Sequence, residues 1–300
     1  MDSTDPTEPA PTEPTDPTDP SHSWVQHATD NGVSWITLNR PEAMNAIAPD
    51  QRERIISLLD AASAEPAVRA VVITAVGKGF CAGADLRGAS APESASAPSS
   101  APSSSPSPAT DERVAGDVAR TIRRGAQRLI SAVLDCEKPV IAAVNGTAAG
   151  LGAHLALACD LVLAAESARF IEVFVRRGLV PDGGGAYLLP RLVGPQRAKE
   201  LMFFGDALGA ADAARMGLVN RVVADAELGA TAKEWAERLA AGPTRALALT
   251  KHLVNTSLDA DRSSAFAAEA WAQEINMTTR DANEGVAGFV ARRTPKYRGL

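Results

Sequence analysis

Apolar residues recur along this chain with two different periods, which together predict strands followed by helices. Residues 24–38 alternate between apolar and polar positions around Asn31-Gly32, a dipeptide that favours a tight turn, so we expect a hairpin there. Pro49 stands at the first turn of a segment with helical spacing, and residues 71–74 form a short apolar run. This part of the chain therefore predicts two paired strands, a helix and a third strand.

The middle of the chain repeats a strand, a turn and a helix. Apolar residues at helical spacing predict one helix over 111–134, whose opposite side carries arginines typical of a solvated face. A strand at 140–144, a helix at 151–158 and a strand at 161–164 follow. Because strand, helix and strand in succession imply parallel crossovers, we expect an α/β fold.

After about Val223 the pattern is helical throughout. Four helices are expected, over 228–240, 244–255, 262–277 and 282–292. The predicted organisation is thus an α/β core over 23–223 and a helical C-terminal part over 224–300.

Two segments have compositions that do not suit a packed core. Residues 1–22 are dominated by Thr, Pro and acidic residues, and we expect a disordered tail because they bury too little apolar area to offset ordering entropy. Residues 88–110 are almost wholly Ser, Ala and Pro and read as a low-complexity insertion. The insertion is either an inert linker or a lid ordered by ligand, and its sequence does not decide between them.

Composition and charge exclude several classes of protein. The 300 residues are 45% hydrophobic, which is ample for a core, and carry a net charge of −6. An acidic surface gives no support for sequence-independent nucleic-acid binding. The weakly polar run near 142–165 is interrupted by polar residues, so we expect no membrane span, and the acidic beginning lacks the pattern of a signal peptide. We therefore expect a cytoplasmic protein.

The three cysteines do not form a recognisable metal or disulfide pattern. Cys81, Cys136 and Cys159 are widely spaced, with no CxxC pair and no histidine at ligand spacing. Cys81 stands beside a glycine turn that matters below, but we interpret it as a buried structural thiol. No metal site is predicted.

The segment GLVPDGGGAYLL, residues 178–189, carries the strongest chemical signal. It places Asp182 between a proline and three glycines, where a bare backbone can approach a ligand and the acid can exchange a proton with it. Two more glycine turns follow apolar strands, at residues 80–86 (FCAGADL) and within residues 142–160 (AAVNGTAAGLGAHLALACD). Backbone N–H groups in such turns can be aimed at an anionic oxygen. One acid and two amide donors suit the chemistry of an enolate.

These motifs, together with LNRPEAMNAI at residues 38–47, resemble the successive signatures of the enoyl-CoA hydratase/isomerase family, the crotonase superfamily. The similarity runs from about Trp24 to Tyr297, omitting the tail and the insertion. It implies a crotonase-like spiral of ββα repeats with a helical C-terminal trimerisation part. It further implies acyl-CoA thioester substrates, a homotrimer or homohexamer, no metal and no cofactor, since coenzyme A is part of the substrate.

Carried over from the family, the two oxyanion-hole amides fall on Ala84 and Leu151. The second position is usually glycine in the family, but only its N–H is needed. The two glutamates that hold water in family hydratases align with His154 and Phe174, neither of which is a carboxylate. Asp182, by contrast, falls where certain isomerases of the superfamily have an aspartate, and its segment is similar to the phenylacetate-pathway enoyl-CoA isomerase.

Coenzyme A contacts are expected from backbone in two loops. The resemblance places Ala82, Gly83, Asp85 and Leu86 in one loop and Ala43 in the other, beside the adenine. For Asp85, a role in capping its turn is equally consistent with the sequence.

The mechanistic hypothesis is that Asp182 removes a proton from C2 of a 3-enoyl-CoA and returns it to C4. We expect apolar surroundings from Phe174, Val180 and Tyr187 to raise its pKa; the alternative is an aspartate that only caps the following helix. His154, three residues after Leu151 and therefore on the same helical face as that amide, is either a buried structural histidine or a second acid/base. For Glu172 a surface or capping role is favoured over an acid role.

Three functions therefore remain open at this stage. The leading hypothesis is a Δ3-Δ2 enoyl-CoA isomerase, the second a hydratase that uses Asp182 and His154 with water, and the third an acyl-CoA binder without catalysis.

Overall fold

The computed structural model describes residues 23–86 and 115–300, and it contains two sheets. The larger has six strands in the order β1-β2-β3-β5-β7-β10, and the smaller has four in the order β4-β6-β8-β9. The larger sheet consists of β1 (Val25–Asp30), β2 (Val33–Leu38), β3 (Ala70–Ala75), β5 (Val140–Val144), β7 (Leu161–Ala165) and β10 (Arg221–Val223). The tail, and the insertion at 88–110, lie outside the described residues.

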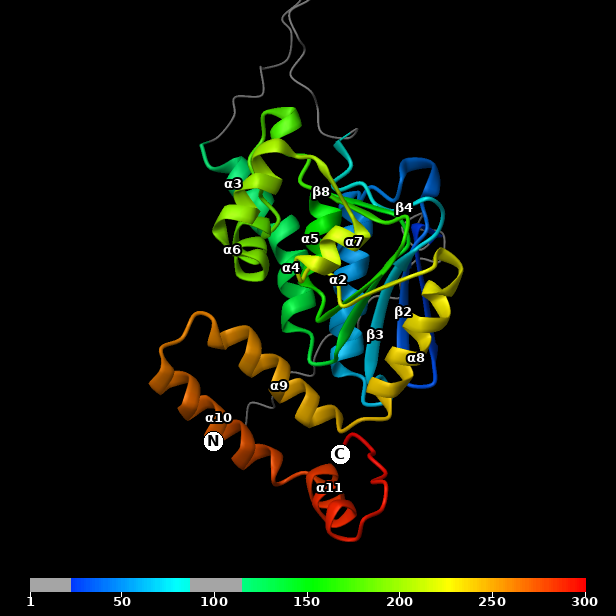
Figure 1. Ribbon diagram of the computed structural model, residues 1–300, viewed down its shortest axis with the longest axis vertical. Helices are drawn as coiled ribbons and strands as arrows, with labels where there is room; N and C mark the ends of the chain where they lie inside the picture. Colours follow the sequence, from blue (N-terminus) through cyan, green and yellow to red (C-terminus); the bar gives the residue numbers. More distant parts are fainter. Residues whose placement is uncertain (1–22, 87–114) are drawn as a thin grey trace, which may run out of the picture.

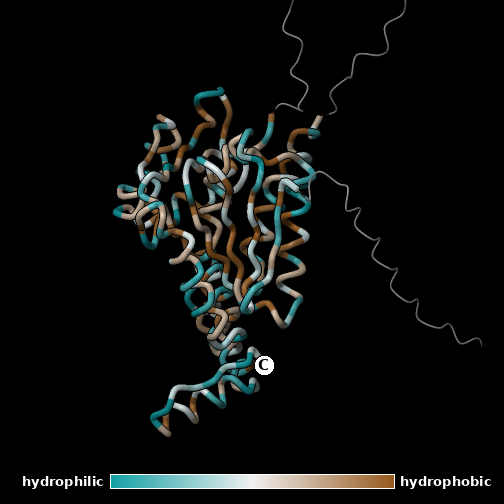
Figure 2. The backbone as a smooth tube through the Cα atoms, turned by 90° about the vertical axis from the view of Figure 1, so that its right-hand side faces the viewer, coloured by the Kyte–Doolittle hydropathy of each residue, from teal (hydrophilic) through white to brown (hydrophobic). Residues whose placement is uncertain are grey.

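The hairpin and the parallel crossovers form as their patterns predict. β1 and β2 pair antiparallel across Asn31-Gly32, and both turn residues have positive φ, as the tight turn requires. β2, β3, β5, β7 and β10 then pair in parallel. Buried Val, Ile, Leu and Ala side chains make these strands the hydrophobic interior, visible as the brown strands in Figure 2.

The smaller sheet is built from very short strands. These are β4 (Gly79–Cys81), β6 (Thr147–Ala149), β8 (Arg169–Ile171) and β9 (Ala207–Gly209). β3, β5 and β7 are each followed in sequence by a strand of the smaller sheet and then by helix. The repeating unit is therefore ββα, as in the predicted spiral.

Helices pack against the strands on several sides of this core (Figure 1). α2 (Pro49–Ala64), α4 (Ala126–Asp135), α5 (Leu151–Ala158) and α6 (Gly185–Phe204) contact one another in that order, whereas α8 (Leu228–Ala240) packs against strands of the larger sheet. Shorter helical pieces are η1 (Pro41–Ala43), α3 (Asp117–Arg124), η3 (Val175–Arg177), α7 (Ala210–Arg215) and η4 (Asp225–Glu227).

The single helix expected over 111–134 was wrong. In the described part it consists of α3 and α4, separated at Gly125, which has φ −106° and ψ −100°. A Cβ atom at this position would lie 2.7 Å from the Thr121 carbonyl oxygen and equally close to the Arg52 guanidinium. The break therefore falls at a residue without a side chain, where the chain passes close to Arg52 of α2.

The C-terminal helices extend away from the core (Figure 1). They are α9 (Thr244–Ser257), α10 (Arg262–Asn276) and α11 (Arg280–Val290), close to the ranges that their spacing predicts. In the described part of the chain, no helix is both long and apolar enough to cross a membrane.

Candidate active site

Three parallel strands of the smaller sheet bring the predicted site together. β4 pairs with β6, and β6 pairs with β8, all in parallel. Because parallel strands end at the same edge of a sheet, the turns that follow them meet there. Ala84 follows β4, Leu151 and His154 follow β6, and Glu172 follows β8.

The two glycine turns lie directly against each other. Gly83 has φ +101°, and a Cβ atom on it would lie 3.0 Å from the Ala149 carbonyl oxygen and 3.5 Å from the Leu151 nitrogen. Only glycine permits this close approach. Leu151 is the first residue of α5, a position whose N–H has no acceptor within its helix. The Ala84 and Leu151 amides are thus held by adjacent turns, as an oxyanion hole requires.

Leu151 is accommodated without backbone strain. Gly150 takes the unusual conformation, with φ 52° and ψ −122°, whereas Leu151 is already helical. Its side chain is buried, and a Cβ atom on Gly183 would lie only 2.7 Å from its Cδ1. The departure from the family's glycine at this position therefore leaves the N–H in place.

Asp182 lies in the turn before α6, at the edge of the smaller sheet where β4, β6 and β8 end. The N-cap of α6 is Gly184, and no side chain caps the helix, so the alternative that Asp182 is a helix cap is wrong. Its main chain is held by Gln127, whose Nε2 donates to the Asp182 carbonyl oxygen over 3.4 Å. The carboxylate itself is left partly exposed beside the site.

Burial raises the pKa of Asp182, and the electrostatic interaction with His154 opposes this effect. The direction agrees with the prediction, but the surroundings differ from it. Val180 is 77% exposed, and the Tyr187 hydroxyl points to Asp259 instead, donating a hydrogen bond of 2.5 Å. The group that acts electrostatically on Asp182 is therefore His154.

The glycine run after Asp182 makes room for His154 and not only for a ligand. A Cβ atom at Gly185 would overlap the His154 ring, and one at Gly183 would lie 3.2 Å from its Nδ1. The ring is completely buried and stacks on Phe174, with centroids 5.3 Å apart. Packing against His154 therefore explains why Gly183 and Gly185 are glycines, and the sequence did not reveal this contact.

Glu172 is part of the site, contrary to expectation. It is only 5% exposed, and its Oε2 lies 3.0 Å from Nε2 of His154. The surface or capping role that the sequence favoured was wrong. The available signal was its position directly after a strand parallel to the one that leads to His154.

Comparison with known proteins agrees with this geometry. The enoyl-CoA hydratase/isomerase family profile matches residues 28–105 and 110–299. The chain belongs to this family. It is therefore an enzyme of the enoyl-CoA hydratase/isomerase type, a family that acts on acyl-CoA.

The relatives of this protein include both named isomerases and named hydratases. The 1,2-epoxyphenylacetyl-CoA isomerase of Escherichia coli is 35% identical over 90% of this chain and 96% of its own length. The crotonyl-CoA hydratase of Syntrophomonas wolfei is also 35% identical, over 87% of this chain and 92% of its own. The crystal structure of an enoyl-CoA hydratase from Bacillus anthracis has 31% identity and a TM-score of 0.80, covering 92% of this chain and all of that one. The crotonase-like fold is thereby confirmed.

The loops expected to contact coenzyme A in this family member are joined to each other. Ile47 bridges Ala84 in parallel, and the Ala82 N–H donates to the Met44 carbonyl, so Ala43 and the 82–86 turn lie in one layer. Ala84 and Leu86 are exposed, while Gly83 is buried. The exposed parts of this layer are open to a ligand.

Asp85 has a partner that the sequence did not indicate. Its Oδ2 accepts a hydrogen bond of 2.6 Å from Nη1 of Arg40, and both side chains are largely buried. Buried Asn45 supports the same loop: its Oδ1 accepts from the Arg40 N–H, and its Nδ2 donates to the Val76 and Gly79 carbonyls. Asp85 therefore ties the two loops together.

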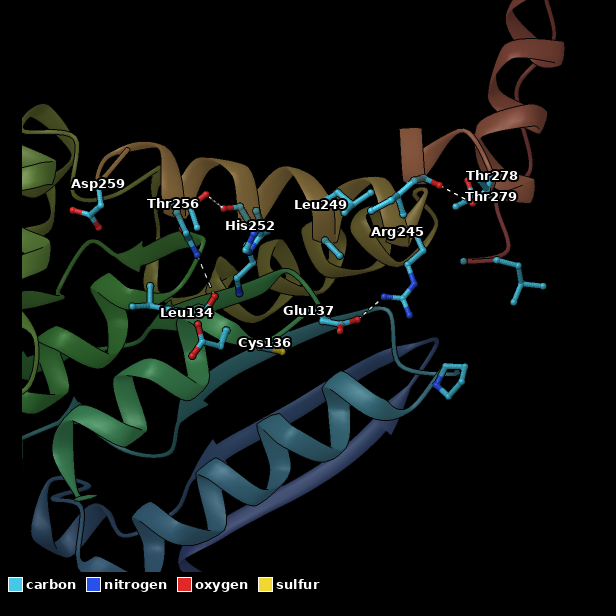
Figure 3. Close-up of a pocket in the computed structure, with 18 of the residues that line it drawn as sticks. Leu134, Cys136, Glu137, Arg245, Leu249, His252, Thr256, Asp259, Thr278 and Thr279 are labelled. Carbon is cyan, nitrogen blue, oxygen red and sulfur yellow. Dashed lines mark hydrogen bonds and ion pairs between the residues drawn. The ribbon is translucent and has the colours of Figure 1, made fainter. Parts of the chain in front are cut away.

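A cleft of about 1070 Å³ lies away from these residues, between the end of α4 and the C-terminal helices (Figure 3). Arg245, Leu249 and His252 line it from α9, and Cys136 and Glu137 line it from the core. None of the predicted site residues lines this cleft, so it is not the candidate active site.

Cys81 is a structural thiol, as expected. It is fully buried, and burial raises its pKa to about 12. Because the thiolate is the nucleophilic form, a thiol of such high pKa is a poor nucleophile at neutral pH.

Proposed function

We propose that this enzyme converts 3-enoyl-CoA thioesters into 2-enoyl-CoA thioesters, with Asp182 as the single acid/base. Asp182 removes a proton from C2, and the protonated carboxyl then returns it to C4. One carboxylate can serve both steps because it becomes the acid once it has acted as the base. The observation that carries the proposal is a partly buried carboxylate of raised pKa, free of any helix-capping role, beside the Leu151 turn.

The negative charge that forms during the reaction needs donors at the thioester oxygen. The Ala84 and Leu151 N–H groups are proposed to supply them, at a value of about 3 kcal/mol per donor in comparable sites. Coenzyme A is proposed to lie along the layer formed by Ala43, Ala82, Gly83 and Leu86, with Asp85 holding that layer through Arg40. No cofactor beyond the coenzyme A of the substrate is required for this proton transfer.

Hydration is the second candidate, because His154 offers a second polar group. Its Nδ1 is buried and has no hydrogen-bond partner within the described residues, so a water held there and by Asp182 could add to a 2-enoyl-CoA. The named hydratases among the relatives are consistent with this alternative. A binder without catalysis would show neither reaction.

One experiment separates these functions. The enzyme is incubated with a 3-enoyl-CoA or with crotonyl-CoA in deuterated water, and products and label are measured by mass spectrometry. We expect isomerisation of the first substrate, with deuterium entering C4 or C2 only to the extent that the protonated Asp182 exchanges with solvent before it reprotonates the dienolate, and no addition of water to the second. Asp182→Asn should lower turnover by about 10²–10⁴-fold while the thioester still binds, because the base is lost and the shape is kept.

Asp206→Asn is the matched control, since Asp206 is an exposed carboxylate outside the site. It should retain wild-type turnover. Unchanged isomerisation by Asp182→Asn would overturn the assignment of the base, and hydration of crotonyl-CoA at a rate above isomerisation would establish the second candidate instead.

The subunits are proposed to form a homotrimer or a homohexamer. Large apolar side chains remain exposed on the C-terminal helices and on α6, including Trp271 at 70%, Phe289 at 85% and Phe204 at 68%. Apolar surface of this kind marks contact sites between proteins.

A further inference from the structure

The buried pair of Glu172 and His154 has no part in the proton transfer described above. His154 is 0% exposed and Glu172 is 5% exposed, and the two are joined by the 3.0 Å contact between Nε2 and Oε2. Since the partner of Nε2 is a carboxylate oxygen, Nε2 carries the proton. Burying a polar group lowers the stability of the fold unless that group is paired. Nε2 and Oε2 pair with each other but Nδ1 has no partner among the described residues, so the buried pair needs an explanation.

The ring of His154 is fixed in one orientation. Phe174 stacks on it with an interplanar angle of 13°, and Gly183 and Gly185 pass so close that any side chain there would displace it. Glu172 holds Nε2. The ring can therefore neither turn over nor move away from the Asp182 turn without disrupting these contacts.

The other ring nitrogen faces that turn. Nδ1 of His154 has no hydrogen-bond partner among the described residues, and it lies 3.2 Å from where a Cβ atom of Gly183 would be. Leaving a buried nitrogen unpaired costs about 1–3 kcal/mol. Asp182 directly precedes Gly183 in this turn, and it interacts electrostatically with His154.

We propose that Glu172 and His154 act as a positioning pair for Asp182: Glu172 holds the imidazole with Nδ1 toward the Asp182 turn, and the unpaired Nδ1 orients the Asp182 carboxylate when substrate is bound. This inference rests on the proposed function of Asp182. Glu172 fixes the orientation of the imidazole through Nε2, and the opposite nitrogen, Nδ1, lies next to Gly183 in the Asp182 turn. His154 does not itself exchange a proton with the substrate, since it has no exposed surface.

The charges around Asp182 agree with this role. Burial raises the pKa of Asp182, and the electrostatic interaction with His154 is the main opposing effect. From α4, the group that contacts the Asp182 turn is the uncharged amide of Gln127, and from the end of β8 the charged group is Glu172, which faces His154. Removing the His154 imidazole should therefore raise the pKa of Asp182 further.

The test is the pH profile of kcat/KM for isomerisation of a 3-enoyl-CoA by His154→Gln and Glu172→Gln. In the wild type, activity falls at low pH as Asp182 becomes protonated. Both variants should move this acid limb to higher pH, with KM little changed, and the deficit should shrink well above the new midpoint. His252→Gln, which removes an imidazole from the cleft on α9, should leave the profile unchanged.

The outcomes separate this inference from the proposed function. An acid limb that stays in place in both folded variants overturns the positioning pair, and so does a loss of activity in His154→Gln as complete as in Asp182→Asn at every pH. If His154→Gln does not fold, the Glu172→Gln profile decides alone. Full turnover by Asp182→Asn, measured in parallel, would instead refute the proposed function.

Discussion

At the scale of single residues, the site combines groups that would be unfavourable elsewhere. Asp182 is partly desolvated, and His154 keeps an unpaired buried nitrogen. Such features persist only where the surrounding structure enforces them, and they concentrate at functional sites. We therefore expect these features to lower the free energy of unfolding while they serve the function of the site.

Asp182→Asn is expected to stabilise the fold at neutral pH. The pKa of Asp182 is raised in the folded state, so its ionisation costs stability above the folded pKa and costs nothing below the ordinary value of 3.8. The amide avoids this cost. Urea denaturation should show a higher midpoint for the variant at pH 7, and the difference should shrink as the pH falls toward 3.8. A variant less stable than the wild type at pH 7 would contradict this account.

At the scale of elements, the ends of three-residue strands and the first turn of α5 do the positioning. β4, β6 and β8 are short, but their parallel register brings their ends to one edge. The helix start then offers N–H groups without intrahelical partners. The proposed oxyanion hole is therefore a property of how these elements join, and no side chain would provide it.

Leu151→Pro tests this point, because proline is tolerated at the first position of a helix yet has no N–H. The variant should lose about 10²–10³-fold in kcat, the loss found on removing one oxyanion donor elsewhere. Leu151→Ala is the control: it removes the same buried side chain but keeps the N–H. Equal activities in steady-state assays of the two variants would show that the Leu151 amide has no catalytic part.

At the scale of the whole molecule, a few polar contacts attach the projecting helices to the core. Nζ of Lys251, on α9, lies 2.9 Å from Oδ2 of Asp160 and also donates to the Val133 carbonyl over 2.9 Å. Arg69, just before β3, donates to the Thr244 hydroxyl and to the Gly242 carbonyl. These contacts hold the base of the C-terminal part in place.

Lys251→Met should destabilise the fold by about 3 kcal/mol, near the lower end for breaking a buried pair because Asp160 is 22% exposed. Burial raises the pKa of Asp160 while Lys251 opposes this, so losing Lys251 penalises the ionised carboxylate further. The deficit should therefore be smallest near pH 3.8 and grow as the pH rises through the folded pKa.

Lys233→Met is the control for this whole-molecule effect, since Lys233 is 52% exposed and its ion pairs are 3.6 and 3.7 Å long. Chemical denaturation of both variants across pH provides the measurement. A pH-independent deficit in Lys251→Met would show that lost packing, and not the charge of Asp160, is responsible.

The sequence by itself determined the elements with a clear period and the positions that carry chemistry. The hairpin at Asn31-Gly32, the helix at 151–158 and the C-terminal helices follow from local spacing, because side-chain period and turn residues act within a few positions of one another. Asp182 and the glycine turns were visible for the same reason: each is a local pattern.

Only the tertiary structure decided which groups meet. Strands of three residues are too short to show a period, so the smaller sheet left no local signal. The pairing of Glu172 with His154, the break at Gly125 and the contact of Gly185 with the His154 ring depend on how distant segments pack. Contacts of this kind are set by strand register and by the spacing between helices. Neither can be read from a short stretch of sequence, because both depend on residues far apart in the chain.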